Sequence, residues 1–243
     1  MYKKSRRGIA MLELVFAIVI MGIVLMSAPM LVSQASKASL MGTQQEAIAA
    51  LSTNMGMILT RHWDANDTNE SLSSPILQTD STTTLLNEQV LLGVPTGIRA
   101  GMVLGGSRSF LSSLGGRLRA TPPANFVDGN FDDIDDYDGK VDKLVNEVTT
   151  SIEEGDYVDK NMRFTTTVSY ISDAPTSGGY DTATVTLNNP FGNTIAPPNT
   201  SHIKMVTINA STNNVATELQ KNITLRAFSC NIGSYTLEER SFN

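Results

Sequence analysis

Cysteine is almost absent from the sequence: Cys230 is the single one among 243 residues. A chain with one cysteine cannot close an internal disulfide, and it cannot supply the thiolates of a multi-cysteine zinc site. Disulfide-stapled folds and cysteine-rich zinc folds are therefore excluded. We expect Cys230 to be a small core residue at the end of a strand.

Histidine and aromatic residues are also scarce, and the common catalytic motifs are missing. Aromatic residues make up 6% of the chain, which suits a polar, β-rich domain with a modest core. The two histidines, His62 and His202, lie far apart in the sequence. No G-x-S-x-G, P-loop, G-x-G-x-x-G or H-E-x-x-H pattern occurs. We therefore expect no enzyme, and a tethered hydrolase that uses either histidine is the weakest alternative.

Positive charge is limited, and four of the 18 lysines and arginines precede Gly8. The formal net charge is −6, and it would become −10 if the four cations before Gly8 were removed (Lys3, Lys4, Arg6 and Arg7). An acidic body binds nucleic-acid phosphates poorly, so we expect no nucleic-acid partner. The same charge favours a divalent cation or a basic protein partner.

Only one run of the sequence is long and hydrophobic enough to span a membrane, and it follows these cations. Apolar residues dominate positions 9–32, and Glu13 is the single acid among them. As a helix, this run would extend roughly 36 Å at ~1.5 Å per residue, which is enough to cross a bilayer. The preceding cations place the N-terminus in the cytoplasm. We therefore expect a single-pass inner-membrane protein whose soluble domain is periplasmic.

Glu13 argues against two simpler interpretations of this segment. A secretory signal would also have a basic start and an apolar core, with a small-residue cleavage site near Ala28. A plain membrane anchor would need only apolar residues. A carboxylate at bilayer depth costs at least ~2.5–3.5 kcal/mol, so neither alternative explains why it is present. A partner of opposite charge in the same membrane would explain it.

The order of cations, glycine, apolar residues and one glutamate resembles the N-terminus of type IV prepilins and type II secretion pseudopilins. The resemblance covers residues 3–34. It implies that a prepilin peptidase cuts after Gly8, that Ile9 becomes the N-methylated first residue, and that Glu13 pairs with the N-terminal amine of a neighbouring subunit. Ile9 departs from the commoner aromatic or Met start of the mature chain. The implied function is a structural subunit, of minor type by its length, in a type IV pilus or a secretion pseudopilus.

The remaining sequence predicts an α+β fold of pilin type, in which a long N-terminal helix packs on a C-terminal antiparallel sheet. We expect a leader at 1–8, a membrane-spanning and filament-core helix at 9–32, its amphipathic continuation at 33–62, and a β-rich domain at 63–243. The continuation carries a core-facing apolar stripe at helical spacing. Its members are Met41, Ile48, Leu51, Met55 and Ile58.

Strand patterns occupy the C-terminal third of the chain. Alternating, Val-, Ile- and Thr-rich segments predict strands at 162–171, 181–187, 202–210 and 222–229, joined as an antiparallel meander. Residues 141–152 predict one short strand or helix. The structure of residues 75–124 stays open.

Aspartates crowd one short segment between these regions. Seven of them lie within fifteen positions: Asp128, Asp132, Asp133, Asp135, Asp136, Asp138 and Asp142. Dense like charges repel one another and require full solvation or a cation, and Ca²⁺ prefers such oxygen ligands. The spacing fails as an EF-hand. The segment FDDIDDYDG resembles a stretch of MSHA-type minor pilins.

The two interpretations of this segment are a calcium loop and a solvated acidic turn. If calcium binds, we expect Asp133, Asp135, Asp136 and Asp138 to be the nearest ligands. The alternative function for the whole chain is a membrane-anchored periplasmic calcium-binding module or adhesin. In that case the N-terminal segment serves only as an anchor.

Overall fold

The computed structural model of the chain describes residues 7–68, 74–81, 83–103, 108–144, 162–187, 189, 191–212 and 222–235. The chain divides into two compact units, Met1–Ala49 and Ala50–Asn243. One helix, α1 (Arg7–Leu59), supplies the described part of the first unit and the beginning of the second. The predicted helix is therefore confirmed, and it continues through Pro29, Gly42 and Gly56 without a break.

The last turns of α1 contribute to the core of the second unit. Leu51, Met55 and Ile58 are buried, as the apolar stripe predicts. The prediction that Met41 and Ile48 face the core is wrong, because their side chains are 61% and 50% exposed. Helical spacing alone identifies one face of a helix, but it does not show where along the helix that face becomes covered.

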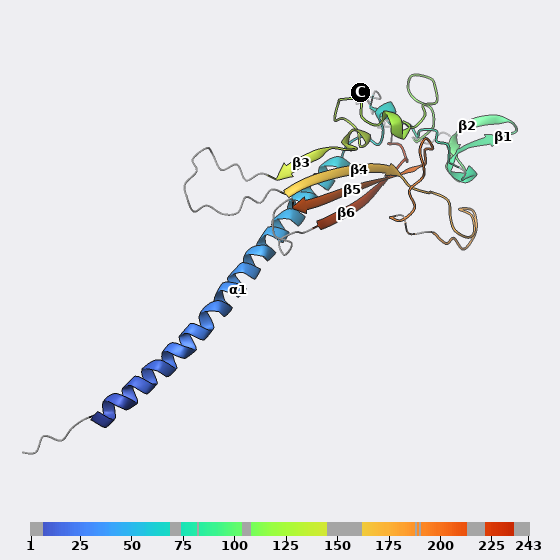
Figure 1. Cartoon of the computed structure of the whole chain (residues 1–243). Helices are drawn as coiled ribbons and strands as arrows, with labels where there is room; N and C mark the ends of the chain where they lie inside the picture. Colours follow the sequence, from blue (N-terminus) through green and yellow to red (C-terminus); the bar gives the residue numbers. More distant parts are fainter. Residues whose placement is uncertain are drawn as a thin grey trace, which may run out of the picture. The chain divides into compact units, whose positions relative to one another are not determined.

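The main sheet of the second unit is an antiparallel meander. Its strands are β3 (Val141–Leu144), β4 (Met162–Tyr170), β5 (Ile203–Thr212) and β6 (Asn222–Cys230), in the spatial order β3-β4-β5-β6 (Figure 1). The fold is therefore α+β, with an apolar N-terminal helix and an antiparallel sheet. Residues 145–152 of the predicted element at 141–152 lie outside the described residues.

The side chains of β4 and β5 alternate between a buried and a more exposed face. In β4 the buried positions are Met162, Phe164, Thr166, Val168 and Tyr170. In β5 the corresponding face includes Lys204, Val206, Ile208 and Ala210. The register sets Lys204 of β5 directly opposite Tyr170 of β4. A lysine therefore occupies a core position of the sheet, which is rare unless the charge is paired.

The predicted strand at 181–187 is wrong. The segment forms turns: the Thr182 backbone N–H donates to Gly179 O at 3.0 Å, and the Thr182 hydroxyl donates to Thr184 O at 2.9 Å. Only Thr186 makes an isolated bridge, with Ser177. The alternating pattern was present, but local hydrogen bonds of Thr and Gly replaced the pairing that a strand requires.

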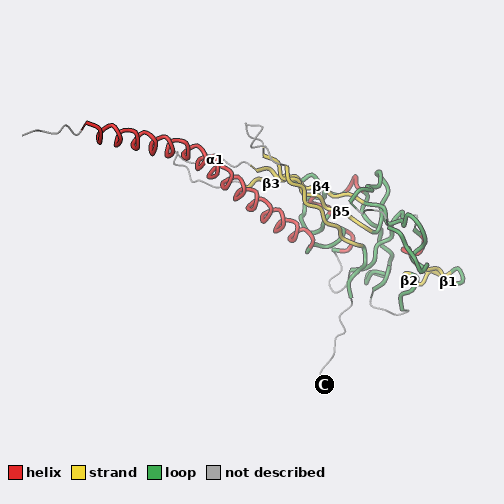
Figure 2. The backbone as a smooth tube through the Cα atoms, turned by 90° about the horizontal axis from the view of Figure 1, so that it is seen from below, coloured by secondary structure: helices red, strands yellow, loops and turns green. Residues whose placement is uncertain are grey.

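Residues 75–124, which the sequence left open, contain a small second sheet. Strands β1 (Glu88–Leu91) and β2 (Val94–Arg99) form a hairpin, and short 3-10 helices at Thr84–Leu86 and Pro123–Asn125 flank it in sequence. The rest is irregular, and Figure 2 shows how much of the second unit consists of loops. These loops bring distant parts of the chain to one end of the main sheet.

Candidate functional site

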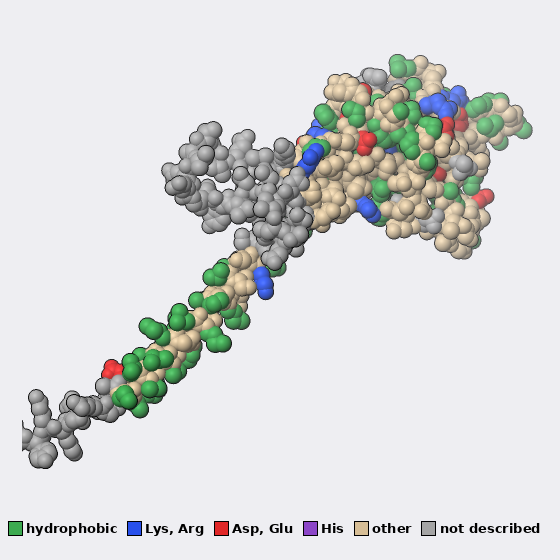
Figure 3. Space-filling model, viewed as in Figure 1, with side chains coloured by type: hydrophobic (Ala, Val, Ile, Leu, Met, Phe, Trp, Pro, Cys, Tyr) green, Lys and Arg blue, Asp and Glu red, His purple; other side chains and the backbone are tan. Residues whose placement is uncertain are grey.

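The first candidate site is the apolar segment of α1. It covers Met11–Ala38, has a mean hydropathy of 2.6, and is not buried within the protein. Figure 3 shows apolar side chains along the visible face of this segment. A helix that is apolar on all sides suits lipid or the interior of a helical bundle. The chain therefore has one N-terminal helix that is long and apolar enough to span a membrane.

The residues predicted for processing and assembly lie at the start of this helix. Gly8 and Ile9 belong to the first turn of α1, so the helix passes through the predicted cleavage position. Glu13 is exposed, and among the described residues no cation lies within ion-pair distance of it. Processing at Gly8 and the assembly role of Glu13 stay predictions.

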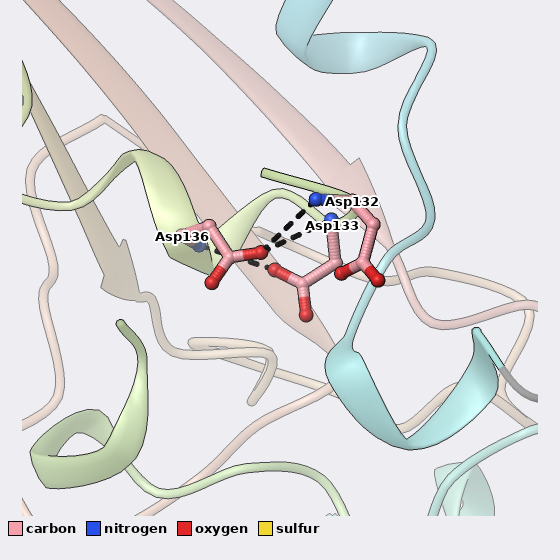
Figure 4. Close-up of side chains that lie close together, drawn as sticks. All are labelled: Asp132, Asp133 and Asp136. Atoms are coloured by element: carbon pink, nitrogen blue, oxygen red, sulfur yellow. Dashed lines mark hydrogen bonds between the residues drawn. The ribbon is translucent and has the colours of Figure 1, made fainter. Parts of the chain in front are cut away.

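The second candidate site is the aspartate segment. Asp132, Asp133 and Asp136 each place a carboxylate oxygen within 4.8 Å of the others (Figure 4). Asp133 Oδ1 accepts hydrogen bonds from the backbone N–H groups of Asp135 at 2.7 Å and Asp136 at 3.1 Å. Asp133 Oδ2 is buried and has no hydrogen-bond partner. A buried oxygen without a donor is costly, and a cation in this cluster would remove that cost.

Two of the four expected calcium ligands, Asp133 and Asp136, thus lie together with Asp132. The other two expected ligands make different contacts. Asp138 Oδ1 accepts the backbone N–H of Val168 at 2.8 Å and so holds the segment to β4. Asp135 lies on the short 3-10 helix Asp135–Tyr137 and forms an ion pair with Lys204. Calcium binding itself stays a prediction.

Lys204 is the centre of a buried ionic cluster that the sequence analysis missed. Its ammonium donates to Asp64 Oδ2 at 2.8 Å, to the Trp63 carbonyl at 2.9 Å, and to Asp135 Oδ1. The side chains of Lys204, Asp64 and Asp135 have no solvent-exposed area. We call these three residues the Lys204 cluster.

Aromatic rings enclose the Lys204 cluster. The ammonium lies 4.2 Å from the Trp63 ring centroid, 5.4 Å from Phe126 and 5.3 Å from Tyr170. Rings at these distances stabilise a cation through their quadrupoles and also exclude water. The charges of the cluster therefore interact in a medium of low polarity, where their attraction is stronger than at a surface.

The two carboxyl groups of the cluster differ in their hydrogen bonds. Both oxygens of Asp64 accept donors, among them the backbone N–H of Thr121 at 2.9 Å and its hydroxyl at 2.7 Å. Burial by itself would raise the pKa of Asp64, but the charge of Lys204 and these hydrogen bonds outweigh burial and lower it. Asp64 is therefore ionised.

Asp135 has the opposite tendency. Its Oδ2 is buried and lacks a hydrogen-bond partner. Burial and the nearby charges of Asp64 and Asp133 raise the pKa of Asp135 to about 8, although Lys204 opposes them. Burial, with the charges of Asp136 and Asp64, likewise raises the pKa of Asp133 to about 7. The single cation, Lys204, thus stabilises the ionised form of Asp64. The negative charge of a second ionised carboxylate, Asp135, is not fully compensated.

The two histidines belong to separate networks. His202 Nδ1 accepts from Arg99 Nη2 at 3.0 Å and Asn231 Nδ2 at 3.1 Å, so Nε2 carries the proton and faces Asn87 Oδ1 at 3.2 Å. In a catalytic triad Nδ1 would donate to a carboxylate instead. Burial and the charge of Arg99 lower the pKa of His202 to about 4, so it is neutral. This arrangement is that of a structural histidine.

His62 lies just beyond the end of α1 and is 45% exposed at its side chain. Its Nδ1 is 3.4 Å from Asp67 Oδ1, and its backbone carbonyl accepts the N–H of Ile134 at 3.0 Å. Burial raises the pKa of Asp67 to about 6, with His62 opposing this change. The backbone bond to Ile134 holds the aspartate segment beside the end of α1, which is a structural role.

A signal for the Lys204 cluster was present in the sequence. In the strand Ile203–Thr212, period-two alternation puts Lys204 on the same face as Val206, Ile208 and Ala210. A lysine on an apolar strand face requires a buried anion. Its partners could not be read in this way, because Asp64 and Asp135 are 140 and 69 residues away.

Comparison with known proteins finds no significant match to this chain. No protein-family model matches the chain, no curated protein is significantly similar to it in sequence, and no solved structure is significantly similar to it.

Proposed function

We propose that the chain is a structural subunit of a membrane-derived filament, either a type IV pilus or a type II secretion pseudopilus. The observation that carries this proposal is the unburied apolar helix segment Met11–Ala38 with Glu13 near its start. A plain anchor would gain nothing from a carboxylate that costs at least ~2.5–3.5 kcal/mol in lipid. A helical bundle of subunits, by contrast, can supply both an apolar environment and a cation for it.

In this proposal the protein is first a single-pass protein of the inner membrane, with the second unit in the periplasm. The prepilin peptidase cuts after Gly8, and Ile9 becomes the methylated N-terminus. Other pilin or pseudopilin subunits then surround Met11–Ala38, and the N-terminal amine of a neighbouring subunit pairs with Glu13. The antiparallel sheet and its loops remain outside the bundle and form the exposed body of the subunit.

The N-terminal peptide tests this proposal. We expect mass spectrometry of the protein from native membranes to show a methylated Ile9 as the first residue. Gly8→Val should abolish this product. Gly22→Ala is the matched control, because a methyl group at Gly22 meets no atom within 4 Å and should leave processing intact. An intact Met1, or a new terminus after Ala28, would contradict the proposal.

A second candidate function is a membrane-anchored calcium-binding module. The observation that favours it is Asp133 Oδ2, which is buried without a donor in the cluster of Asp132, Asp133 and Asp136. These carboxylates fit a hard cation of six to eight oxygen ligands, whose remaining ligands would be water or backbone carbonyls. The ion would brace the aspartate segment against its own charge and need perform no chemistry.

Calcium titration separates this candidate from a solvated acidic turn. Calcium at a hundred times its dissociation constant should stabilise the full chain by about 2.7 kcal/mol in thermal or chemical unfolding. Asp133→Asn should remove this effect, whereas Asp138→Asn, which alters a contact to β4, should retain calcium binding. Equal unfolding curves with calcium and with a chelator would exclude the calcium site and leave the filament proposal unaffected.

A further inference from the structure

The Lys204 cluster brings together the groups of an amide bond. The Lys204 amine contacts Asp135 Oδ1 and lies 2.8 Å from Asp64 Oδ2. All three side chains are fully buried, and the rings of Trp63, Phe126 and Tyr170 lie around the amine. Water is a product of condensation between an amine and a carboxyl group, so a site that excludes water favours the amide.

The charge of the cluster also favours condensation. One ammonium and two carboxylates are buried together, and each ion taken out of water carries a large desolvation cost. Joining Lys204 to one carboxyl group replaces a cation and an anion by a neutral amide. A single buried anion then remains, and it can accept a hydrogen bond from the new amide N–H.

The hydrogen bonds assign different roles to the two carboxyl groups. The oxygens of Asp64 are fixed by Thr121 and by the backbone N–H of Asn66 at 3.1 Å, so Asp64 is held as a carboxylate. Asp135 Oδ2 has no partner, so no donor is lost when this oxygen leaves. Asp135 is therefore the acyl donor, and Asp64 is the proton acceptor beside the amine.

We propose that Lys204 and Asp135 form an intramolecular isopeptide bond after the chain folds. Lys204 Nζ gives a proton to Asp64, and its lone pair attacks Cγ of Asp135. The bond from Cγ to Oδ2 then breaks. Counted from the ionised form of Asp135, one of the three ammonium protons stays on the amide nitrogen and two leave with the Asp135 oxygen as water. Asp64 relays protons and ends ionised, as it began, and no oxidant or reductant is needed.

Such a bond would be a covalent link in a chain that cannot form an internal disulfide. It would join β5 to the aspartate segment, between positions 69 residues apart. Cross-links that close long loops reduce the freedom of the unfolded chain most in the chain-entropy description. The inference is independent of the filament proposal, because it concerns only residues of the second unit.

Intact-mass measurement of the full chain, purified in detergent, tests the bond. We expect a mass lower than that of the sequence by one water, after the N-terminal peptide has been assigned separately. Trypsin should fail to cleave after Lys204 and should release a branched peptide that joins residues 120–140 to residues 164–221. A folded chain with the full mass and with cleavage at Lys204 would show an ion pair only and overturn the proposal.

Four variants identify the reacting groups. Lys204→Arg and Asp64→Asn should each restore the full mass, while Lys140→Arg, a control at a lysine outside the cluster, should keep the loss of water. Asp135→Asn should lose one ammonia in place of one water, because its side-chain amide nitrogen is then the leaving group. Loss of water in Asp135→Asn would make Asp64 the acyl donor and overturn the assignment. Circular dichroism must show folded protein for each variant before its mass is interpreted.

Discussion

The helix segment Met11–Ala38 and the interior of the second unit reverse the usual distribution of residues. In the helix, apolar side chains such as Ile18 and Met26 are 62% and 83% exposed, and one acid stands among them. In the second unit, Lys204, Asp64 and Asp135 are fully buried among aromatic rings. Residue type alone therefore does not determine burial in this protein.

The difference lies in where each region finds its partners. The second unit supplies both the lysine and the carboxylates, so its buried charges are paired within one chain. In the part of the chain that the structure describes, no apolar surface covers the helix segment and no cation lies within ion-pair distance of Glu13. A region without such partners among the described residues is suited to lipid or to contacts with other subunits.

The largest expected effect comes from removing the buried cation. Lys204→Met leaves Asp64 and Asp135 buried without a positive partner and also removes the proposed bond to Asp135, so it should lower the free energy of unfolding by at least about 3–5 kcal/mol. Chemical denaturation of the full chain in detergent measures this loss. Lys140→Met is the control, because Lys140 is partly exposed and pairs with Asp142 at 3.4 Å, and it should cost at most about 1 kcal/mol. Equal losses in the two variants would contradict the difference between buried and surface pairs.

The second effect concerns the charge in the apolar helix. Glu13→Gln should favour the lipid-inserted form by about 2.5–3.5 kcal/mol, because an ionised carboxylate no longer enters the bilayer. We expect this variant to stay in the membrane fraction and to be missing from sheared filaments. Lys37→Gln, at the other end of the same segment, should still enter filaments, since a lysine near the end of an apolar segment can reach the interface with its long side chain. Filaments of normal yield from Glu13→Gln would contradict the role of Glu13 in assembly.

The third effect is a pH dependence of stability that comes from the buried, neutral His202. The pKa of His202 is about 4 in the folded protein, below the ordinary value of 6.5, so the unfolded chain binds the proton more strongly. Its contribution to stability is therefore complete above pH 6.5 and is lost as the pH falls toward 4, by up to about 3 kcal/mol. His202→Gln should lower stability but remove this dependence between pH 6.5 and 4. If the free energies of unfolding of the variant and the wild type change in parallel across this pH range, His202 is not the source of the dependence.

The smallest effect concerns an exposed apolar residue in the second unit. Leu92 lies at the tip of the β1–β2 hairpin, is 98% exposed, and has a positive φ of 51°. Asn-Gly is favoured in such a turn, so Leu92→Asn before Gly93 should raise the free energy of unfolding by about 0.5–1 kcal/mol. Val103→Asn, at a position 80% exposed, should leave stability nearly unchanged. A loss of stability in Leu92→Asn would show that the leucine side chain makes contacts that favour the fold.

Much of the fold could be predicted from periodicity. The long helix and the strands β4, β5 and β6 occur where apolar spacing placed them. The last turns of the helix and the strands β4 and β5 each bury one face, and these faces supply the apolar positions of the pattern. The segment 181–187 had the same alternation, yet it forms turns. Its threonines hydrogen-bond to nearby backbone groups, and no strand pairs with it beyond the bridge at Thr186.

The candidate sites were predictable in part. The aspartate segment was found from its charge density, and Asp133 and Asp136 do lie together with Asp132. The sequence could not separate Asp135 and Asp138 from them. Asp135 faces Lys204, and Asp138 accepts the Val168 N–H, and both contacts depend on how the segment lies against the sheet.

The sequence by itself determined the apolar N-terminal helix, its single carboxylate, and the alternating strands, because these features depend on spacing between neighbours along the chain. The tertiary structure decided which charges meet. Lys204, Asp64 and Asp135 come from three distant segments, and only the packing of the loops against the sheet excludes water and brings them into contact. Electrostatic interactions depend on distance and burial, and neither is a local property of the sequence.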